Sequence, residues 1–282
     1  MAILCGLIGA GIQGSRSPAL HESEAKAQGL DLSYRLIDLD VLGVGPEALP
    51  GLLEKARREG FSGLNITFPC KQAVIPLLDA VSDEARAIGA VNTVVIAEGG
   101  LTGYNTDGPG WARGFRRALP GADVSRVALL GAGGAGSACA DAILRLGTRE
   151  LRIVDREPGR AGELAARMNA IHGERCSASA GIAQALAGAT GLIHATPNGM
   201  SKLPGMPLPA ELLHPGLWVS EVVYVPLETG LLKAARRAGC RVMDGGHMNV
   251  GQALGGFRLF TGRDADAARM EAHFRSLLEV VA

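Results

Sequence analysis

The sequence predicts an α/β protein built from two units, and three observations support this prediction. Short β-like runs alternate with helical runs nearly throughout the chain, a pattern typical of mainly parallel sheets covered by helices. The same alternation restarts after about residue 110. The length of 282 residues is enough for two domains of ordinary size. We therefore expect two α/β units with a ligand cleft between them.

The first unit should contain three strands, a hairpin and two helices, and both helices end at a glycine, which is the common helix terminator. The expected strands are residues 1–9, 33–40 and 61–68, the hairpin is 90–107, and the helices are 17–29 and 46–60.

The strand at residues 61–68 has an unusual polar face. Leu64, Ile66 and Phe68 should point to one side of it. Asn65 and Thr67 should point to the other, so an amide and a hydroxyl line the strand. A bland structural strand does not need these groups.

The second unit begins with a strand, a glycine turn and a helix, and further strands follow at short intervals before a helical tail. The strand–turn–helix run is residues 126–147, the later strands are 150–155, 189–196, 217–224 and 240–246, and the tail is 249–282.

Composition excludes several classes of protein. Lys plus Arg and Asp plus Glu number 28 each, so nothing indicates a nucleic acid or an anionic membrane as partner. The five cysteines are scattered without metal-ligand spacing, which predicts reduced thiols in the cytoplasm and no metal site. The N-terminus lacks a leading basic region, so it predicts a first strand and not a signal peptide. No apolar run approaches the ~20 residues that a membrane helix needs.

A dinucleotide fingerprint opens the second unit. Gly131, Gly133 and Gly136 form G-x-G-x-x-G after a short apolar strand and at the start of a helix. Gly131 permits the tight turn, Gly133 lets the backbone approach the pyrophosphate, and Gly136 allows close helix–strand contact. The helix N-terminus then donates N–H groups to the phosphate. Gly134 and Ala135 complete the predicted cofactor loop.

The acidic residue at the end of the next strand bears on the cofactor. Asp155 can accept hydrogen bonds from both ribose hydroxyls and repels a 2′-phosphate, which favours NAD over NADP. Arg156 argues for NADP instead, because an arginine can pair with a 2′-phosphate. Two other interpretations of the turn remain: a plain strand–helix connection, or an adenosylmethionine methyltransferase, which the two-unit layout fits poorly.

The first unit contains polar residues at positions where an α/β domain without a ligand site would not need them. Several of these residues could instead have an ordinary structural role. Ser17 could be a helix N-cap, Asp107 a turn residue, Asn92 a hydrogen-bond partner at a strand end, and Lys71 an exposed lysine. Together they supply hydroxyls, amides, one cation and one anion, which suits a small polyhydroxylated molecule. The set is Ser15, Ser17, Asn65, Thr67, Lys71, Asn92, Asn105, Thr106, Asp107 and Gln252.

Seven motifs occur in order along the chain: "SRSPALHE", "NITFPCKQ", "GAVNT", "YNTDG", "GAGGAG", "ATPNGM" and "DGGHMNVGQA". Through these motifs the chain resembles, from end to end, the shikimate dehydrogenase family, most closely its NAD-dependent quinate/shikimate branch. The resemblance implies a substrate domain (1–109), a Rossmann NAD-binding domain (110–247) and C-terminal helices (248–282) that return to the first domain. Two departures, Arg16 in place of a leucine and "VDREPGR" in place of an N-R-T-like segment, favour the NAD-using branch.

The resemblance also implies roles for individual residues. Lys71 and Asp107 are the catalytic pair: Lys71 exchanges a proton with the substrate hydroxyl, and Asp107 orients Lys71. The implied substrate ligands are Ser15, Ser17, Asn65, Thr67, Asn92, Gln252 and, at the carboxylate end, Tyr224. The residues implied around the nicotinamide are Thr196, Val223, Gly246 and Met248.

The expected function is hydride transfer between NAD and a ring hydroxyl of quinate or shikimate, with a dehydro-acid as the ketone, in aromatic biosynthesis or quinate catabolism. Two alternatives remain: a dehydrogenase of a related cyclitol acid such as an aminated analogue, and a nucleotide-sensing protein without turnover. An intact Lys71–Asp107 pair argues against the sensor, which does not need both residues. The expected partner is a small hydroxy acid, and the expected assembly is a monomer or homodimer.

Overall fold

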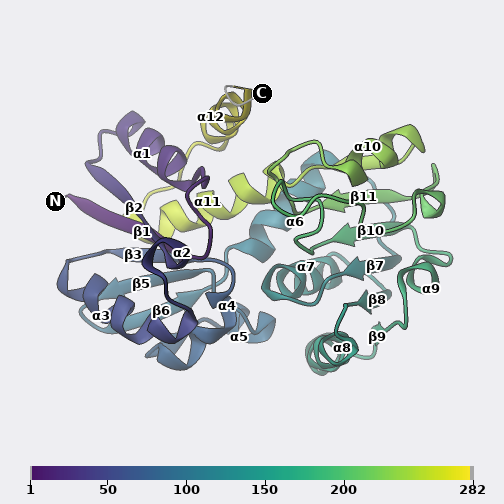
Figure 1. Ribbon diagram of the computed structural model, residues 1–282, viewed down its shortest axis with the longest axis horizontal. Helices are drawn as coiled ribbons and strands as arrows, with labels where there is room; N and C mark the ends of the chain where they lie inside the picture. The colour runs from purple at the N-terminus through teal and green to yellow at the C-terminus, as the bar shows by residue number, and fades with distance from the viewer. Residues whose placement is uncertain (1, 280–282) are drawn as a thin grey trace. The chain divides into compact units, whose positions relative to one another are not determined.

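A computed structural model of the chain describes residues 2–279 and divides it into two compact units. Residues 1 and 280–282, at the ends of the expected domains, lie outside the described residues. The first unit comprises the chain up to Thr106 together with the segment from Gln252 onward, and the second is Asp107–Gly251. Each unit contains one six-stranded sheet (Figure 1).

The first sheet is mixed, with the strand order β2-β1-β3-β5-β6-β4. β1 pairs in parallel with β2 and β3, whereas β5 runs antiparallel to both β3 and β6. The β5–β6 pair is the hairpin expected from the sequence. The strands are β1 (Ile3–Gly9), β2 (Leu32–Asp38), β3 (Gly63–Ile66), β4 (Ala80–Val81), β5 (Thr93–Ala97) and β6 (Gly100–Tyr104).

Helices cover both faces of the first sheet (Figure 1). On one face an apolar cluster joins the sheet to α3 and α5, and on the other Phe257 and Phe260 of α11 pack beside α1. The helices of this unit are α1 (Ser17–Ala27), α2 (Leu39–Leu42), α3 (Leu49–Arg58), α4 (Cys70–Ala73), α5 (Asp83–Ile88), the later part of α11 (Gly246–Thr261), and α12 (Ala267–Glu279), with 3₁₀ turns at Pro46–Ala48 and Ile75–Leu77.

The second sheet is wholly parallel, with the strand order β12-β11-β10-β7-β8-β9. Read from β9, this is the 3-2-1-4-5-6 order of the dinucleotide-binding fold, and the order reverses between β7 and β10. Its strands are β7 (Arg126–Leu130), β8 (Glu150–Val154), β9 (Cys176–Ala178), β10 (Gly191–His194), β11 (Trp218–Glu221) and β12 (Arg241–Met243).

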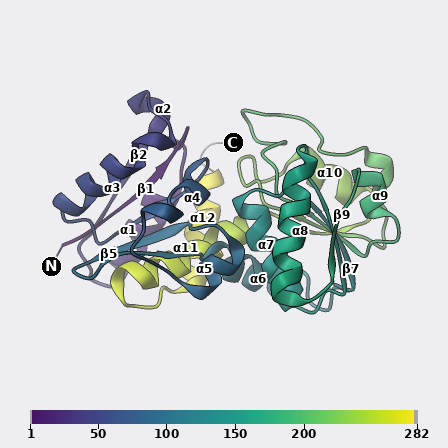
Figure 2. The ribbon, with the colours of Figure 1, turned by 90° about the horizontal axis from the view of Figure 1, so that it is seen from below.

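Helices again form two layers on the second sheet. Figure 2 shows these helices around the sheet. One apolar cluster joins the sheet to α6, α7 and α8, and another joins it to α9 and α10. The bounds are α6 (Asp107–Ala118), α7 (Gly134–Arg145), α8 (Pro158–His172), α9 (Ile182–Leu186) and α10 (Gly230–Arg237), with a 3₁₀ turn at Ala210–Leu212.

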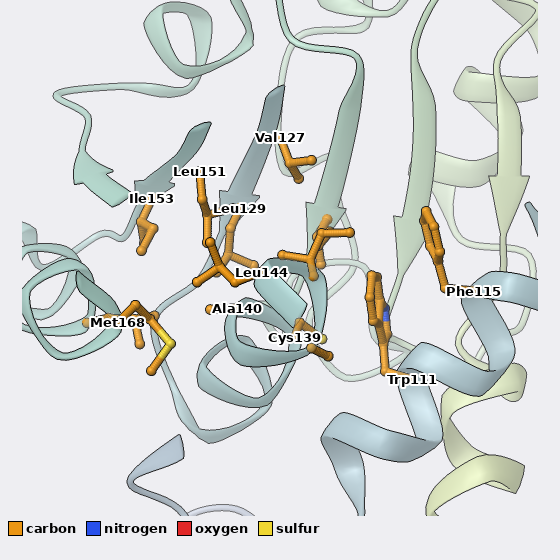
Figure 3. Close-up of a cluster of buried hydrophobic side chains, with 14 of the residues drawn as sticks. Trp111, Phe115, Val127, Leu129, Cys139, Ala140, Leu144, Leu151, Ile153 and Met168 are labelled. Carbon is orange, nitrogen blue, oxygen red and sulfur yellow. The ribbon is translucent and has the colours of Figure 1, made fainter. Parts of the chain in front are cut away.

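Aromatic residues of α6 anchor this helix to the second sheet (Figure 3). Trp111 stacks on Phe115 with ring centroids 4.9 Å apart, and Phe115 meets Trp218 of β11 edge-on at 4.8 Å. The indole Nε1 of Trp111 donates a hydrogen bond to Ser220 Oγ at 3.0 Å, so its one polar atom is satisfied in the core.

The predicted fold class is confirmed: two α/β units, the second with Rossmann topology, and C-terminal helices that return to the first unit. One local expectation is wrong. β3 ends at Ile66, and Phe68, expected on the apolar face of the strand, is 76% exposed. Leu64 and Ile66 do lie in the core. Within residues 2–279, every helix is too short or too polar to cross a membrane.

Candidate active site

The polar segments of the first unit meet at one edge of its sheet. β1 and β3 are parallel neighbours, so both end at the same edge. β5 begins there, because Thr93 is opposite Asn65, and β6 ends there, because Tyr104 is opposite Thr93. Ligand sites in α/β proteins commonly form at such an edge. The predicted residues in these segments are Ser15, Ser17, Thr67, Lys71 and Asn92.

A buried hydrogen-bond network holds the end of β6 against the start of β5. The Asn92 side chain accepts from the backbone N–H of Thr106 at 2.8 Å and donates to the Thr106 hydroxyl at 2.9 Å. The hydroxyl of Thr93 donates to Asn92 Oδ1 at 3.0 Å. Asn92 therefore fixes the backbone immediately before Asp107, in addition to any contact it makes with a ligand.

Asn65 belongs to the same network and is only 4% exposed. Its amide nitrogen donates to the Asn92 carbonyl at 3.3 Å and to the Thr93 hydroxyl at 3.0 Å. Its Oδ1 accepts from the Tyr34 hydroxyl at 2.7 Å. Both amide hydrogens of Asn65 are thus used within the fold, and its Oδ1 retains one lone pair. Its role as a substrate ligand stays a prediction.

Asp38 is a site-shaping residue that the sequence reasoning missed. It lies at the end of β2, and its carboxylate accepts from the backbone N–H groups of Gly11 and Ile12, both at 2.9 Å. Burial raises the pKa of Asp38, but hydrogen bonds from Gln13 and these backbone groups outweigh burial and hold it below its ordinary value. The carboxylate so fixes the loop that leads to Ser15. The only signal was an aspartate at a strand end in "LIDLD".

Ser15 and Ser17 lie where this loop enters α1. Ser17 is the first helical residue, and the N-cap position is Arg16, which makes no side-chain capping bond. The alternative of Ser17 as an N-cap is therefore wrong. The backbone N–H of Ser17 donates to Ser15 Oγ at 3.2 Å, and the Ser17 side chain is buried.

Lys71 follows β3 on α4, which is a single turn. The carbonyl of Lys71 accepts from the backbone N–H of Val91 at 2.8 Å, which places the Lys71 segment beside the one that carries Asn92. Thr67 donates its backbone N–H to the Ile8 carbonyl at 2.9 Å, at the end of β1.

Helix α11 reaches the same network from the C-terminal segment. A Cβ on Gly255 would lie 2.9 Å from Thr106 Cβ, and one on Gly256 would lie 3.3 Å from Asn65 Nδ2. The helix therefore approaches this edge closely only because both residues lack side chains. Gln252 precedes Gly256 by one turn, so it lies on the same face of α11.

Asp107 is the first residue of α6, in the second unit, and is only 4% exposed. The alternative of an ordinary turn aspartate is therefore wrong, because the residue begins a twelve-residue helix and is buried.

The glycine loop of the second unit connects β7 to α7 in a conformation that only glycine tolerates. Gly131 has φ +107°, and a Cβ there would lie 3.0 Å from Thr196 Cγ2. A Cβ on Gly136 would collide with the carbonyl oxygen of Gly131. Gly133 occupies the N-cap of α7. This cradle fits a dinucleotide pyrophosphate, which needs close backbone approach at a helix N-terminus.

Asp155 follows β8 and reaches back to the glycine loop. Its Oδ2 accepts from the backbone N–H of Ala132 at 2.7 Å, and its Oδ1 accepts from that of Glu157 at 2.9 Å. Arg156 next to it is exposed. On α8, Arg160 pairs with Glu157 at 3.1 Å. The carboxylate is thereby held beside the loop, with one lone pair on each oxygen still available.

The other predicted cofactor residues follow β10, β11 and β12. Thr196 lies beside Gly131 across the point where the strand order reverses. Val223 follows β11, and a Cβ on Gly245 would collide with its carbonyl oxygen, so the start of α11 lies against it. The parallel register puts these segments at one edge of the second sheet. The residues so placed are Thr196, Val223, Tyr224, Gly246 and Met248.

A buried histidine–carboxylate hydrogen bond beneath this edge was also missed. His194 ends β10 and Glu221 ends β11, and His194 Nδ1 lies 2.8 Å from Glu221 Oε1 with both side chains fully buried. The signal was a histidine and a glutamate inside apolar runs. Among residues 2–279, no three His, Cys, Asp or Glu side chains are grouped so as to hold a metal ion.

Comparison with known proteins gives consistent matches. Residues 7–94 match the model of the shikimate dehydrogenase substrate binding domain. The chain is 56% identical to an NADP(+) shikimate dehydrogenase of Streptomyces avermitilis, covering 97% of this chain and 95% of the relative. It is 48% identical to an NAD(+) quinate/shikimate dehydrogenase of Corynebacterium efficiens, covering 98% and 99%. The solved quinate dehydrogenase of Corynebacterium glutamicum in complex with NAD is 46% identical, with a TM-score of 0.90 and coverage of 98% and 99%.

Proposed function

This chain belongs to the shikimate dehydrogenase family, and we propose that it transfers a hydride between NAD and a ring hydroxyl of quinate or shikimate. Family membership makes it an oxidoreductase that uses a nicotinamide dinucleotide. The proposal adds NAD as the preferred cofactor and quinate and shikimate as substrates, with 3-dehydroquinate or 3-dehydroshikimate as the ketones.

The observation that carries the choice of NAD is the position of Asp155. Its carboxylate lies at the end of β8, hydrogen-bonded to the glycine loop at Ala132, where the adenosine ribose of a dinucleotide binds in this fold. An anion there attracts ribose hydroxyls and repels a 2′-phosphate. The relative at 56% identity is an NADP enzyme, and Arg156 offers a cation for that phosphate. NADP is therefore the competing cofactor.

Hydride exchange at the substrate carbon is the chemistry that the dinucleotide supplies when bound. In the proposed mechanism Lys71 accepts the hydroxyl proton as the alcohol is oxidised and returns it in the reverse direction. Asp107 orients the Lys71 ammonium group. A buried anion and a half-buried cation suit these roles, because such groups hold their geometry better than exposed ones.

The polar edge of the first sheet is the proposed substrate site. Hydroxyls and amides there match a ring that carries several hydroxyls and a carboxylate. Asn65 and Asn92 would also act by holding the site's shape, because the Asn65 side chain bonds to the Asn92 carbonyl and the Asn92 side chain bonds to Thr106. The proposed ligands are Ser15, Ser17, Asn65, Thr67, Asn92, Tyr224 and Gln252.

The test measures oxidation of quinate and of shikimate, each with NAD and with NADP, at neutral and alkaline pH. The proposal expects a higher kcat/KM with NAD for at least one of the two acids. A higher value with NADP for both would refute the cofactor assignment. Turnover of an aminated cyclitol acid but of neither quinate nor shikimate would refute the substrate assignment, and NAD binding without any turnover would favour the sensor.

A further inference from the structure

A chain of buried hydrogen bonds joins the ends of β10 and β11. His194 Nδ1 lies 2.8 Å from Glu221 Oε1, and His194 Nε2 lies 2.6 Å from the Thr196 hydroxyl. His194 and Glu221 are fully buried, whereas Thr196 is half-buried and is the member nearest the surface. A histidine and a carboxylate buried together are costly to desolvate, so their position beneath a ligand loop calls for an explanation.

Glu221 is the centre of this chain. Besides His194, its Oε1 accepts from the backbone N–H groups of Val222 at 2.9 Å and Val223 at 3.0 Å. Its Oε2 accepts from the hydroxyl of Thr229, the N-cap of α10, at 3.0 Å. The glutamate so receives four hydrogen bonds and fixes the backbone that follows β11.

The donors around Glu221 determine where the hydrogens lie. Because the carboxylate accepts, His194 Nδ1 carries a hydrogen, and in a neutral ring Nε2 is then an acceptor. The Thr196 hydroxyl must therefore donate to Nε2. The backbone N–H of Asn198 donates to the Thr196 oxygen at 3.3 Å. In this series of hydrogen bonds, each group therefore donates to the next one along the path toward Glu221.

This order leaves Thr196 with an oxygen that can only accept a further hydrogen bond. Thr196 lies beside Gly131 of the glycine loop through its Cγ2 methyl, so the residue whose hydroxyl the buried pair orients belongs to the cofactor edge. We propose that His194 and Glu221 are positioning residues that hold the Thr196 hydroxyl as an acceptor toward the bound dinucleotide. The inference rests on the proposed function and on the family resemblance, which implies that Thr196 lies near the nicotinamide. An amide N–H, such as that of the nicotinamide carboxamide, is the donor that the Thr196 hydroxyl would accept from.

A second buried histidine–carboxylate pair of the protein serves as a control for a purely structural role of such pairs. His172 Nε2 lies 2.8 Å from Asp141 Oδ1, and this second histidine–carboxylate pair joins α8 to α7. Its side chains are also largely buried. If such pairs only stabilise the unit, H172Q and H194Q should have the same effect on dinucleotide binding. If His194 acts through Thr196, only H194Q should change dinucleotide binding.

The first experiment observes the histidine ring directly by ¹⁵N–¹H NMR of the full chain without dinucleotide. The His194 signals are identified by their loss in H194Q. We expect a neutral ring with its hydrogen on Nδ1. A hydrogen on Nε2, or on both nitrogens, would overturn the proposed order. This measurement needs neither cofactor nor substrate.

The second experiment is a double-mutant cycle on NAD affinity, measured by titration calorimetry for the parent, H194Q, T196V and the double variant. We expect about 3- to 10-fold weaker binding in each single variant, the range for one lost hydrogen bond. The double variant should bind no more weakly than the poorer single one, and H172Q should bind as the parent does. Multiplying single effects, or an unchanged affinity in H194Q or T196V, would overturn the inference.

Two further readouts keep the outcomes separate. Thermal unfolding of each variant shows whether it is folded, and E221Q replaces H194Q in the cycle if H194Q is not. Quinate and shikimate oxidation by the parent tests the proposed function alone. A parent that binds NAD but oxidises neither acid refutes that function and leaves the cycle informative. An active parent with independent effects in the cycle refutes this inference only.

Discussion

The buried Glu24 side chain should determine how firmly the C-terminal segment is held on the first unit. Glu24 of α1 is 1% exposed and accepts two hydrogen bonds from the Arg269 guanidinium of α12, at 2.7 and 2.8 Å. Its Oε1 also accepts from the backbone N–H of Asp266 and from Gln28. The change E24Q keeps the shape but removes the charge and one of the two acceptor oxygens.

The expected loss follows from these contacts. A hydrogen bond to a charged group contributes about 1.5–3 kcal/mol, and E24Q loses at least one such bond to Arg269. Because the Arg269 side chain is 42% exposed, water compensates it in part, so we expect a loss of about 2–3 kcal/mol. At 1.36 kcal/mol per factor of ten, amide hydrogen exchange in α12 should accelerate about 30- to 150-fold.

The effect should also depend on pH. Burial raises the pKa of Glu24, but hydrogen bonds from Arg269, Asp266 and Gln28 outweigh burial and lower it below the ordinary 4.5. A carboxyl with a lowered pKa contributes stability above its unfolded pKa and loses it as the pH falls through its folded pKa. The difference between the parent and E24Q should therefore be full at neutral pH and shrink below about pH 4.5.

The assay is hydrogen exchange with mass-spectrometric readout of α1 and α12, together with urea unfolding. R258Q serves as the control, because Arg258 and Asp264 form an exposed pair at 3.5 Å with side chains 72% and 81% accessible. Such pairs contribute about 0–1 kcal/mol. Equal exchange rates in E24Q and R258Q, or a difference that persists unchanged at low pH, would refute the reasoning.

Three predictions concern the proposed activity. K71M should lower kcat by about 100- to 10,000-fold, the range for a lost general acid–base, with NAD affinity unchanged by calorimetry; ordinary turnover would exclude Lys71 as the proton carrier. G136A should weaken NAD binding at least about tenfold, because its Cβ would meet the carbonyl oxygen of Gly131, whereas G162A on α8, whose Cβ would meet nothing within 4 Å, should bind normally. D155N should lower the ratio of kcat/KM for NAD to that for NADP by about tenfold, because one charge no longer repels the 2′-phosphate. An unmoved ratio would show that Asp155 does not select the cofactor.

Much of the fold could be predicted because its signals are local. The G-x-G-x-x-G turn and the acid after the next strand lie within 25 residues of each other, and each has one structural use in this fold. The hairpin at 90–107 was readable for the same reason. The sequence did not show where the pairing of β3 with its neighbouring strands ends. Phe68 continues the alternation of Leu64 and Ile66, yet it is exposed, because pairing with β1 and β5 ends near Ile66.

The residues of the candidate site could be predicted from the sequence, but their contacts with one another could not. Asn65 and Asn92 stood out as amides in apolar strands, but the bonds of Asn65 to Asn92 and Thr93 depend on the register of β3 against β5. Those of Asn92 to Thr106 depend on where β6 ends beside β5. Asp38 and the His194–Glu221 pair escaped notice, because one polar residue in an apolar run does not reveal its partner in a strand distant in sequence.

By itself, the sequence determined the alternation of strands with helices, the glycine loop with Asp155, and which polar groups are present, because each depends on neighbours along the chain. Tertiary structure decided that the first sheet is mixed, that α11 approaches Asn65 and Thr106 through two glycines, and that Glu221 gathers four donors. These features depend on contacts between distant segments. Such contacts form only when sheets and helices pack, and packing satisfies buried polar groups with whichever partners the register brings within reach.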